Sequence, residues 1–105
     1  MADIKVVQKV VGAEPVITTI ANELKALQTA VGGYIETVSF VDGSDEFSIV
    51  CDEEGKLKGK EANIRFEDDI IVGNIIIVKI EEDDFISMTD AEAERIIQFV
   101  KERMI

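Results

Sequence analysis

The order of apolar and polar side chains predicts a chain built mainly from β-strands. Short runs rich in β-branched residues are typical of strands, and they occupy positions 3–11, 16–19, 34–40 and 46–51. The most apolar stretch runs from Ile70 to Ile80 and predicts the central strand of a sheet. Gly73 within it marks a bulge or the start of the strand proper. Residues 57–66 have mixed polarity and predict only a connecting segment.

Two other segments have the period of an amphipathic helix. The first predicts an early helix, capped by Thr19 or Asn22, whose apolar face consists of Ile20, Leu24, Leu27 and Val31. The second begins with Thr89 and Glu92, which fit the two positions of a capping box. Its apolar face comprises Ala93, Ile96, Ile97, Val100 and Met104.

Turn residues complete the prediction of the fold. Asp42 and Gly43 lie between two predicted strands and favour a hairpin, and Gly55 in the run 52–56 favours a second reversal with a positive φ at that glycine. Strands and helices in this order predict a single α+β domain over residues 1–105. We expect a mostly antiparallel sheet with one early helix and a C-terminal helix, both packed on one face.

The adjacent glycines Gly32 and Gly33 allow two interpretations. A phosphate-binding loop places its glycines at a helix N-terminus, where free N–H groups face the anion. Here they follow the last apolar residue of the early helix, with Glu36 close by. A left-handed residue that closes a helix C-terminus is usually glycine. The sequence therefore favours a structural cap, and a ligand loop is the alternative.

The charge of the chain excludes several functions. Eleven Lys and Arg residues stand against twenty-two Asp and Glu residues, which gives a net charge of −11 with no histidine. Such a chain is repelled by nucleic acid and by anionic membranes, so we expect neither as a direct partner. Without histidine, a Ser-His-Asp triad, a Cys-His pair and a zinc site that uses histidine are impossible. The single Cys51 and the lack of a continuous apolar segment near the N-terminus lead us to expect a cytoplasmic protein without disulfides.

The remaining candidate groups have mostly structural interpretations. The acidic runs at 42–46, 67–69 and 81–84 do not fit an EF-hand, and we interpret them as solvated surface rather than as metal sites. Cys51 precedes three acidic residues that raise a thiol pKa, which favours a buried, inert thiol. Tyr34 favours sheet packing over a place in a pocket. For Arg65, an ion pair with neighbouring carboxylates is preferred to a role in an anion site.

Four blocks of sequence resemble a known family. They are ITTIANELKALQTAVGGYIE, CDEEGKLKGKEANIRF, DDIIVGNIIIV and DFISMTD, and in this order they are similar to the domain-of-unknown-function family DUF3846 over nearly the whole chain. Relatives tend to carry a proline and an adjacent Asn-Arg pair after the Gly-Lys turn, whereas Ile64 separates Asn63 from Arg65 here. The resemblance implies a small cytosolic protein of Gram-positive bacteria, their phages or mobile elements, and it implies no activity or cofactor.

Two hypotheses for the function follow. The first is a non-enzymatic accessory protein whose acidic face contacts a basic surface of another protein. The second is a module that binds a nucleotide or metabolite, in a monomer or at a homodimer interface. The residues of that candidate site are Gly32, Gly33, Tyr34, Glu36, Asn63 and Arg65.

Overall fold

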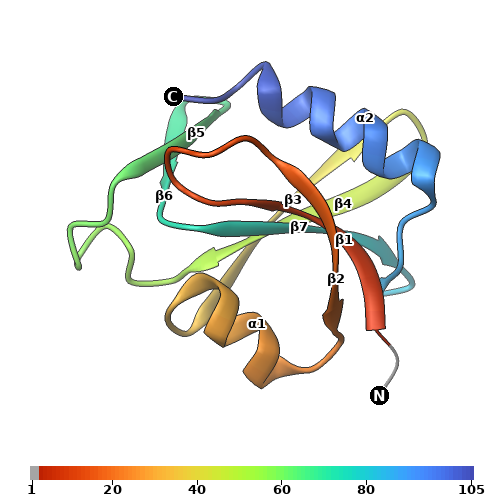
Figure 1. The fold of residues 1–105 in the computed structure, drawn as a ribbon, viewed down its shortest axis with the longest axis horizontal. Coiled ribbons are helices and arrows are strands. Elements are labelled where there is room, and N and C mark those ends of the chain that lie inside the picture. Colours follow the sequence, from red (N-terminus) through yellow and green to blue (C-terminus); the bar gives the residue numbers. More distant parts are fainter. Residues whose placement is uncertain (1–2) are drawn as a thin grey trace.

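The computed structural model describes residues 3–105 and confirms the predicted α+β class (Figure 1). A six-stranded antiparallel sheet is accompanied by a two-stranded sheet and two helices. The elements in chain order are β1 Asp3–Lys9, β2 Val16–Ala21, α1 Leu24–Val31, β3 Ile35–Asp42, β4 Asp45–Asp52, β5 Ala62–Phe66, β6 Asp69–Val72, β7 Ile75–Glu81, β8 Asp84–Ile86 and α2 Asp90–Lys101.

Strand β7 is the centre of the large sheet, whose order is β2-β1-β7-β4-β3. It pairs with β4 on one side, and on its other side β1 pairs with its first half while β8 pairs with its last residues. The predicted central strand is therefore confirmed, but with different bounds. Gly73, at φ +78°, separates β7 from the short strand β6, so Ile70 and Ile71 belong to the small β5–β6 sheet. A glycine in this conformation ends one strand and redirects the chain into the next.

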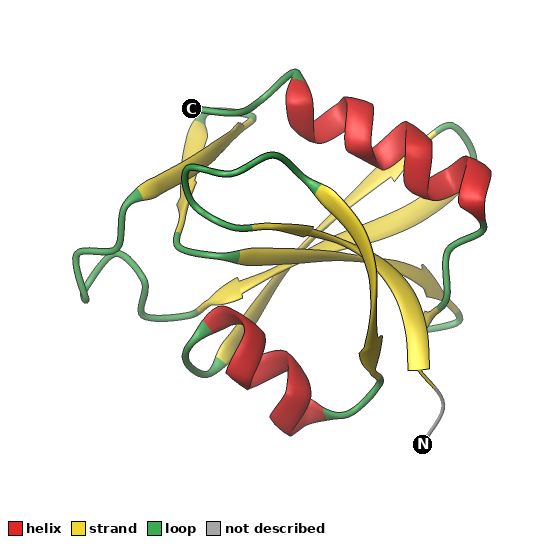
Figure 2. Cartoon of the chain, viewed as in Figure 1, coloured by secondary structure: helices red, strands yellow, loops and turns green. Residues whose placement is uncertain are grey.

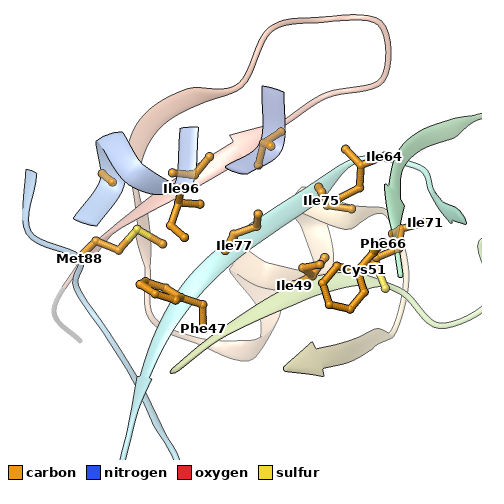
Figure 3. Packing of buried hydrophobic residues seen from close by; sticks show 13 residues of the cluster. Phe47, Ile49, Cys51, Ile64, Phe66, Ile71, Ile75, Ile77, Met88 and Ile96 are labelled. Carbon is orange, nitrogen blue, oxygen red and sulfur yellow. The ribbon is translucent and has the colours of Figure 1, made fainter. Parts of the chain in front are cut away.

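The two helices lie on opposite faces of the large sheet (Figure 2). One face packs against α2 and the β5–β6 sheet and includes Ile49 and Ile77 (Figure 3). The other face packs against α1 and includes Val50 and Ile76, the neighbours of those residues along each strand. Successive strand residues point to opposite faces, so β4 and β7 are apolar on both. The expectation that both helices pack on one face is wrong.

The predicted start of the C-terminal helix is confirmed, and the predicted start of the early helix is wrong. Helix α2 begins with the predicted capping box, in which the Thr89 side chain accepts from the Glu92 N–H and the Glu92 carboxylate accepts from the Thr89 N–H. Helix α1 begins only at Leu24, because Ile20 is paired with Ile4 in the β1–β2 hairpin. Neither predicted residue caps α1, whose N-cap residue is Glu23.

The predicted hairpin is confirmed, since β3 and β4 pair along their whole length and Gly43 in the turn has φ +67°. The prediction for Gly55 is wrong, because the positive φ of that loop occurs at Gly59, at +72°. Residues 57–66, which the sequence predicted only as a connecting segment, contain β5. Among residues 3–105, no helix has both the length and the apolar character needed to span a membrane.

Candidate functional site

The two glycines close helix α1. The Gly32 N–H, at φ +79°, donates to the Gln28 carbonyl oxygen over 2.8 Å, and the Gly33 N–H donates to the same oxygen over 3.1 Å. Both amides are therefore used by the helix itself, as in C-terminal caps. This confirms the structural interpretation of the two residues.

Asp52 connects these glycines to the loop that follows β4. Its side chain is fully buried, and its Oδ2 atom lies 2.8 Å from Lys58 Nζ and 2.7 Å from Lys60 Nζ. Oδ1 accepts from the Glu54 N–H over 2.9 Å. Burial on its own raises the pKa of Asp52, but the hydrogen bonds from the two lysines and from this amide outweigh it, so its pKa lies far below the usual range.

The same two lysines also bind the end of α1. Lys60 Nζ donates to the Val31 carbonyl over 2.8 Å, and Lys58 Nζ donates to the Gly32 carbonyl over 3.2 Å. Cations at a helix C-terminus stabilise its exposed carbonyls and its dipole. A Cβ on Gly33 would lie 2.5 Å from Asp52 Oδ1, so only glycine lets the carboxylate approach this closely.

Sequence reasoning missed this cluster of Asp52, Lys58 and Lys60. The signal was the alternation of lysines at positions 56, 58 and 60, which begins four residues after Asp52, the acidic residue that ends an apolar strand. The cluster joins the two adjacent glycines to the loop of sequence Cys-Asp-Glu-Glu-Gly-Lys. We call Gly32, Gly33, Asp52, Lys58 and Lys60 together the Gly-Gly junction.

A hollow of about 460 Å³ lies beside the junction and is lined in part by Gly32, Lys60, Gly73 and Asn74. Two of its polar side chains already have partners: Lys60 is bound to Asp52, and Asn74 Oδ1 accepts from the Val11 N–H over 3.0 Å. Of the six predicted site residues, only Gly32 lines this hollow.

Asn63 is a buried structural residue, 1% exposed. Its Nδ2 donates to the carbonyl oxygens of Lys9 and Gly73, over 2.9 and 2.8 Å, and its Oδ1 accepts from Lys9 Nζ over 2.8 Å. The Lys9 ammonium also donates to the Val10 carbonyl, and burial lowers its pKa. Asn63 thus holds β1, β5 and the turn before β7 together.

Arg65 is exposed and does not share a surface with Asn63. Its backbone N–H donates to the Arg103 carbonyl over 2.8 Å. Within residues 3–105 its guanidinium has no carboxylate within 4.0 Å, so the expected ion pair with nearby acids is wrong. The structure therefore does not bring Asn63 and Arg65 together as an anion site.

Tyr34 and Glu36 lie toward the outer strand β3. Tyr34 is 70% exposed, so the expectation that it packs against the sheet is wrong. Glu36 lines a second hollow, of about 210 Å³, together with Cys51. Burial raises the pKa of the Cys51 thiol to about 11, and the nearby charges of Glu36 and Asp52 act in the same direction. The expected burial of the thiol is confirmed, and the raised pKa is consistent with low reactivity.

A third hollow, of about 320 Å³, continues the second along β3 and β6. Val38, Asp69 and Ile71 line both of them. We call the combined feature the β3–β6 groove. Its floor includes apolar residues, and its acidic residues are Glu36, Asp52, Glu53, Glu67, Asp68 and Asp69. The one cation among its lining residues, Lys56, is bound to Asp69 over 2.6 Å.

The ion pairs use most of the basic residues and few of the acidic ones. The acidic partners within residues 3–105 are Asp42, Asp45, Asp52, Asp69, Asp90, Glu92 and Glu102. The basic partners are Lys5, Lys56, Lys58, Lys60, Lys79, Arg95 and Arg103. In the same part of the chain, no group of three or more His, Cys, Asp or Glu side chains is arranged to hold a metal ion.

Comparison with known proteins places the chain by family alone. The family model described as Domain of unknown function (DUF3846) matches residues 4–101. No curated protein and no solved structure gave a significant match. The matched range includes the Gly-Gly junction, Asp52 and the β3–β6 groove.

Proposed function

The chain belongs to the DUF3846 family of domains of unknown function, and from that premise we propose that it is a non-enzymatic interaction protein whose acidic surface binds a basic partner protein. The proposal includes a cytoplasmic setting and an origin in a phage or mobile element, both of which follow from the resemblance described above. A partner that normally binds nucleic acid fits this role, because the chain presents a dense array of negative charge.

The proposal rests on one observation: within residues 3–105, most basic side chains are ion-paired or buried, whereas most acidic side chains are not ion-paired. Seven of the eleven basic residues are bound to carboxylates, and Lys9 is buried. Lys25, Arg65 and Lys101 remain exposed within residues 3–105 without an acidic partner. The surface field is therefore strongly negative, and such a field accelerates encounter with a positive partner.

The turn between β7 and β8 concentrates this charge. Residues 81–84 are four consecutive carboxylates, and Glu46 is close to them because it pairs with Ile80 in the sheet. Glu82 and Asp83 both have positive φ, at 52° and 68°. Asn-Gly is the usual choice in such two-residue turns, so this chain keeps two charged residues where neutral ones would be less strained.

The small-ligand alternative has less support. In the hollow beside Gly32, the lysine is bound to Asp52 and the oxygen of Asn74 is bound to the Val11 N–H, and Asn63 is buried in the fold. A nucleotide site needs free donors for the phosphate groups, and the amides of Gly32 and Gly33 are used by the helix cap.

Copurification from the cells that encode the protein tests the proposal. At about 0.1 M salt we expect a basic protein to copurify and to be released at about 0.5 M, because ionic contacts are screened. The recovered material should show no excess absorbance at 260 nm. Absence of a basic protein would refute the proposal, and a small ligand that absorbs at 260 nm would support the alternative.

Matched charge variants sharpen the test. Glu82→Asn combined with Asp83→Gly removes two charges while improving the turn, so the fold is retained. The control, Glu14→Gln combined with Glu94→Gln, removes two exposed charges elsewhere. We expect the first pair to reduce recovery of the partner more than the second. Equal recovery from both double variants and the parent would count against an acidic contact surface.

A further inference from the structure

Strand β3 has a free edge. It pairs with β4, and within residues 3–105 no second strand pairs with it. Asp42 and Asp45 flank the two-residue turn, so they form a hydrogen-bonded pair, and such pairs alternate along the two strands. The backbone N–H and C=O groups of Thr37, Ser39 and Val41 therefore point away from β4. An unpaired row of backbone N–H and C=O groups at a sheet edge can pair with a strand from another molecule.

The β3–β6 groove runs beside this edge. Side chains at even positions of β3, such as Val38, point into it, whereas those at odd positions point to the other face. Leu57 and Ile70 line the groove and stay exposed, with Leu57 at 88%. An apolar floor rimmed by carboxylates is complementary to a ligand that is both apolar and basic.

We infer that the β3 edge and the β3–β6 groove bind an extended segment of a partner protein in which apolar and basic side chains alternate. The segment would pair with the outward backbone groups of Thr37, Ser39 and Val41. Its basic side chains, which share one face of the added strand, would enter the groove, with their apolar stems on the floor and their charged ends at the carboxylates. This inference rests on the proposed function and adds its mode of binding and the chemistry of the segment.

Charge argues against a second copy of this chain as the occupant. A two-fold antiparallel pairing of β3 centred on Ser39 aligns the outward backbone groups, but it places Glu36 opposite Asp42 of the second copy, and this occurs twice. Like charges directly opposite in a sheet are destabilising. A basic segment replaces both repulsions with attractions.

The test uses fluorescein-labelled nine-residue peptides of lysine and valine at about 0.1 M salt, with binding followed by fluorescence anisotropy. One peptide alternates the two residue types, and a second has the same composition with the lysines grouped at one end. We expect the alternating peptide to bind at least about fivefold more tightly, because only its side chains match the two-residue period of the strand.

Three variants locate the binding. Thr37→Pro removes an outward N–H without breaking a β4 hydrogen bond, and we expect at least a tenfold loss of affinity. Leu57→Lys places a positive charge in the groove and should weaken binding about fivefold or more. Leu24→Lys makes the same chemical change at a 57% exposed residue of α1, outside the β3–β6 groove, and should change affinity less than twofold. If Thr37→Pro does not fold, the comparison of Leu57→Lys with its lysine control variant still tests whether the groove binds the peptide.

The outcomes separate this inference from the proposed function. Equal binding of both peptides, lost at high salt and unaffected by Leu57→Lys, overturns the groove and leaves the acidic-surface proposal standing. Failure of every lysine peptide to bind counts against both. Sedimentation that shows a dimer disrupted by Thr37→Pro assigns the edge to a second copy and overturns the inference.

Discussion

Replacing Asn63 with alanine should strongly destabilise the protein, because both N–H groups of its side-chain amide and the amide oxygen are hydrogen-bonded. The carbonyl oxygens of Lys9 and Gly73 would each lose a donor, and Lys9 Nζ would lose an acceptor. The site is fully buried, and alanine leaves a space lined by these three polar groups.

The magnitude follows from those three contacts. Each buried carbonyl left without a donor costs about 1–2 kcal/mol, and loss of the acceptor for a buried ammonium adds about 1.5–3 kcal/mol. Partial relaxation, or a water entering the space, recovers part of this cost. We therefore expect a loss of about 3–5 kcal/mol from the free energy of unfolding, a large share of the ~5–15 kcal/mol typical of a domain.

Urea unfolding followed by circular dichroism measures this loss. The matched control is Arg65→Ala, two residues away on the same strand, which should stay within about 0.5 kcal/mol of the parent because its side chain is exposed and not ion-paired within residues 3–105. A double-mutant cycle with Lys9→Met should give a coupling of at least about 1 kcal/mol. If Asn63→Ala lies within about 1 kcal/mol of Arg65→Ala, the reasoning about this network is wrong.

Three further predictions concern the Gly-Gly junction and the thiol. Gly33→Ala should destabilise by about 1–3 kcal/mol, because the new Cβ would lie 2.5 Å from an oxygen of Asp52, and an unchanged melting temperature would contradict this. The depressed pKa of Asp52 means that its stabilisation is present above its unfolded pKa of about 4 and is lost as the pH falls below it. Melting temperatures of Asp52→Asn should therefore fall less steeply than those of the parent below about pH 4, and parallel curves would refute the ion pairs. With a pKa of about 11, only about 0.1% of Cys51 is thiolate at pH 8, so native iodoacetamide labelling should be far slower than labelling in urea; equal rates would show an accessible thiol.

Local signals in the sequence predicted the features that depend on a few neighbouring residues. The capping box at Thr89 and Glu92, the cap at Gly32 and the hairpin at Gly43 each depend on backbone geometry within one turn. Such geometry is set by the residues themselves. The prediction for Gly55 failed because the loop is fixed by Asp52 rather than by local turn preference.

Features set by distant contacts were not predictable in the same way. Ile20 fits the period of α1, but pairing with Ile4 makes it part of a strand. The opposite placement of the helices follows from β4 and β7 being apolar on both faces, and a short apolar run does not show whether one or both faces are covered. Asn63 was predicted as a candidate ligand-binding residue, and the sequence did not reveal its structural role because its partner Lys9 lies 54 residues earlier in the chain.

The central place of β7 has a consequence for synthesis of the chain. Val7 of β1 pairs with Ile77 of β7. About 70 more residues must therefore be synthesised before β1 can pair with its second neighbouring strand. Until β7 emerges from the ribosome, β1–β2 and β3–β4 are separate hairpins, and isolated hairpins are marginally stable in water. At ~5–20 residues per second this interval lasts several seconds. The nascent chain therefore stays open to proteases and chaperones until one late strand joins both halves of the sheet.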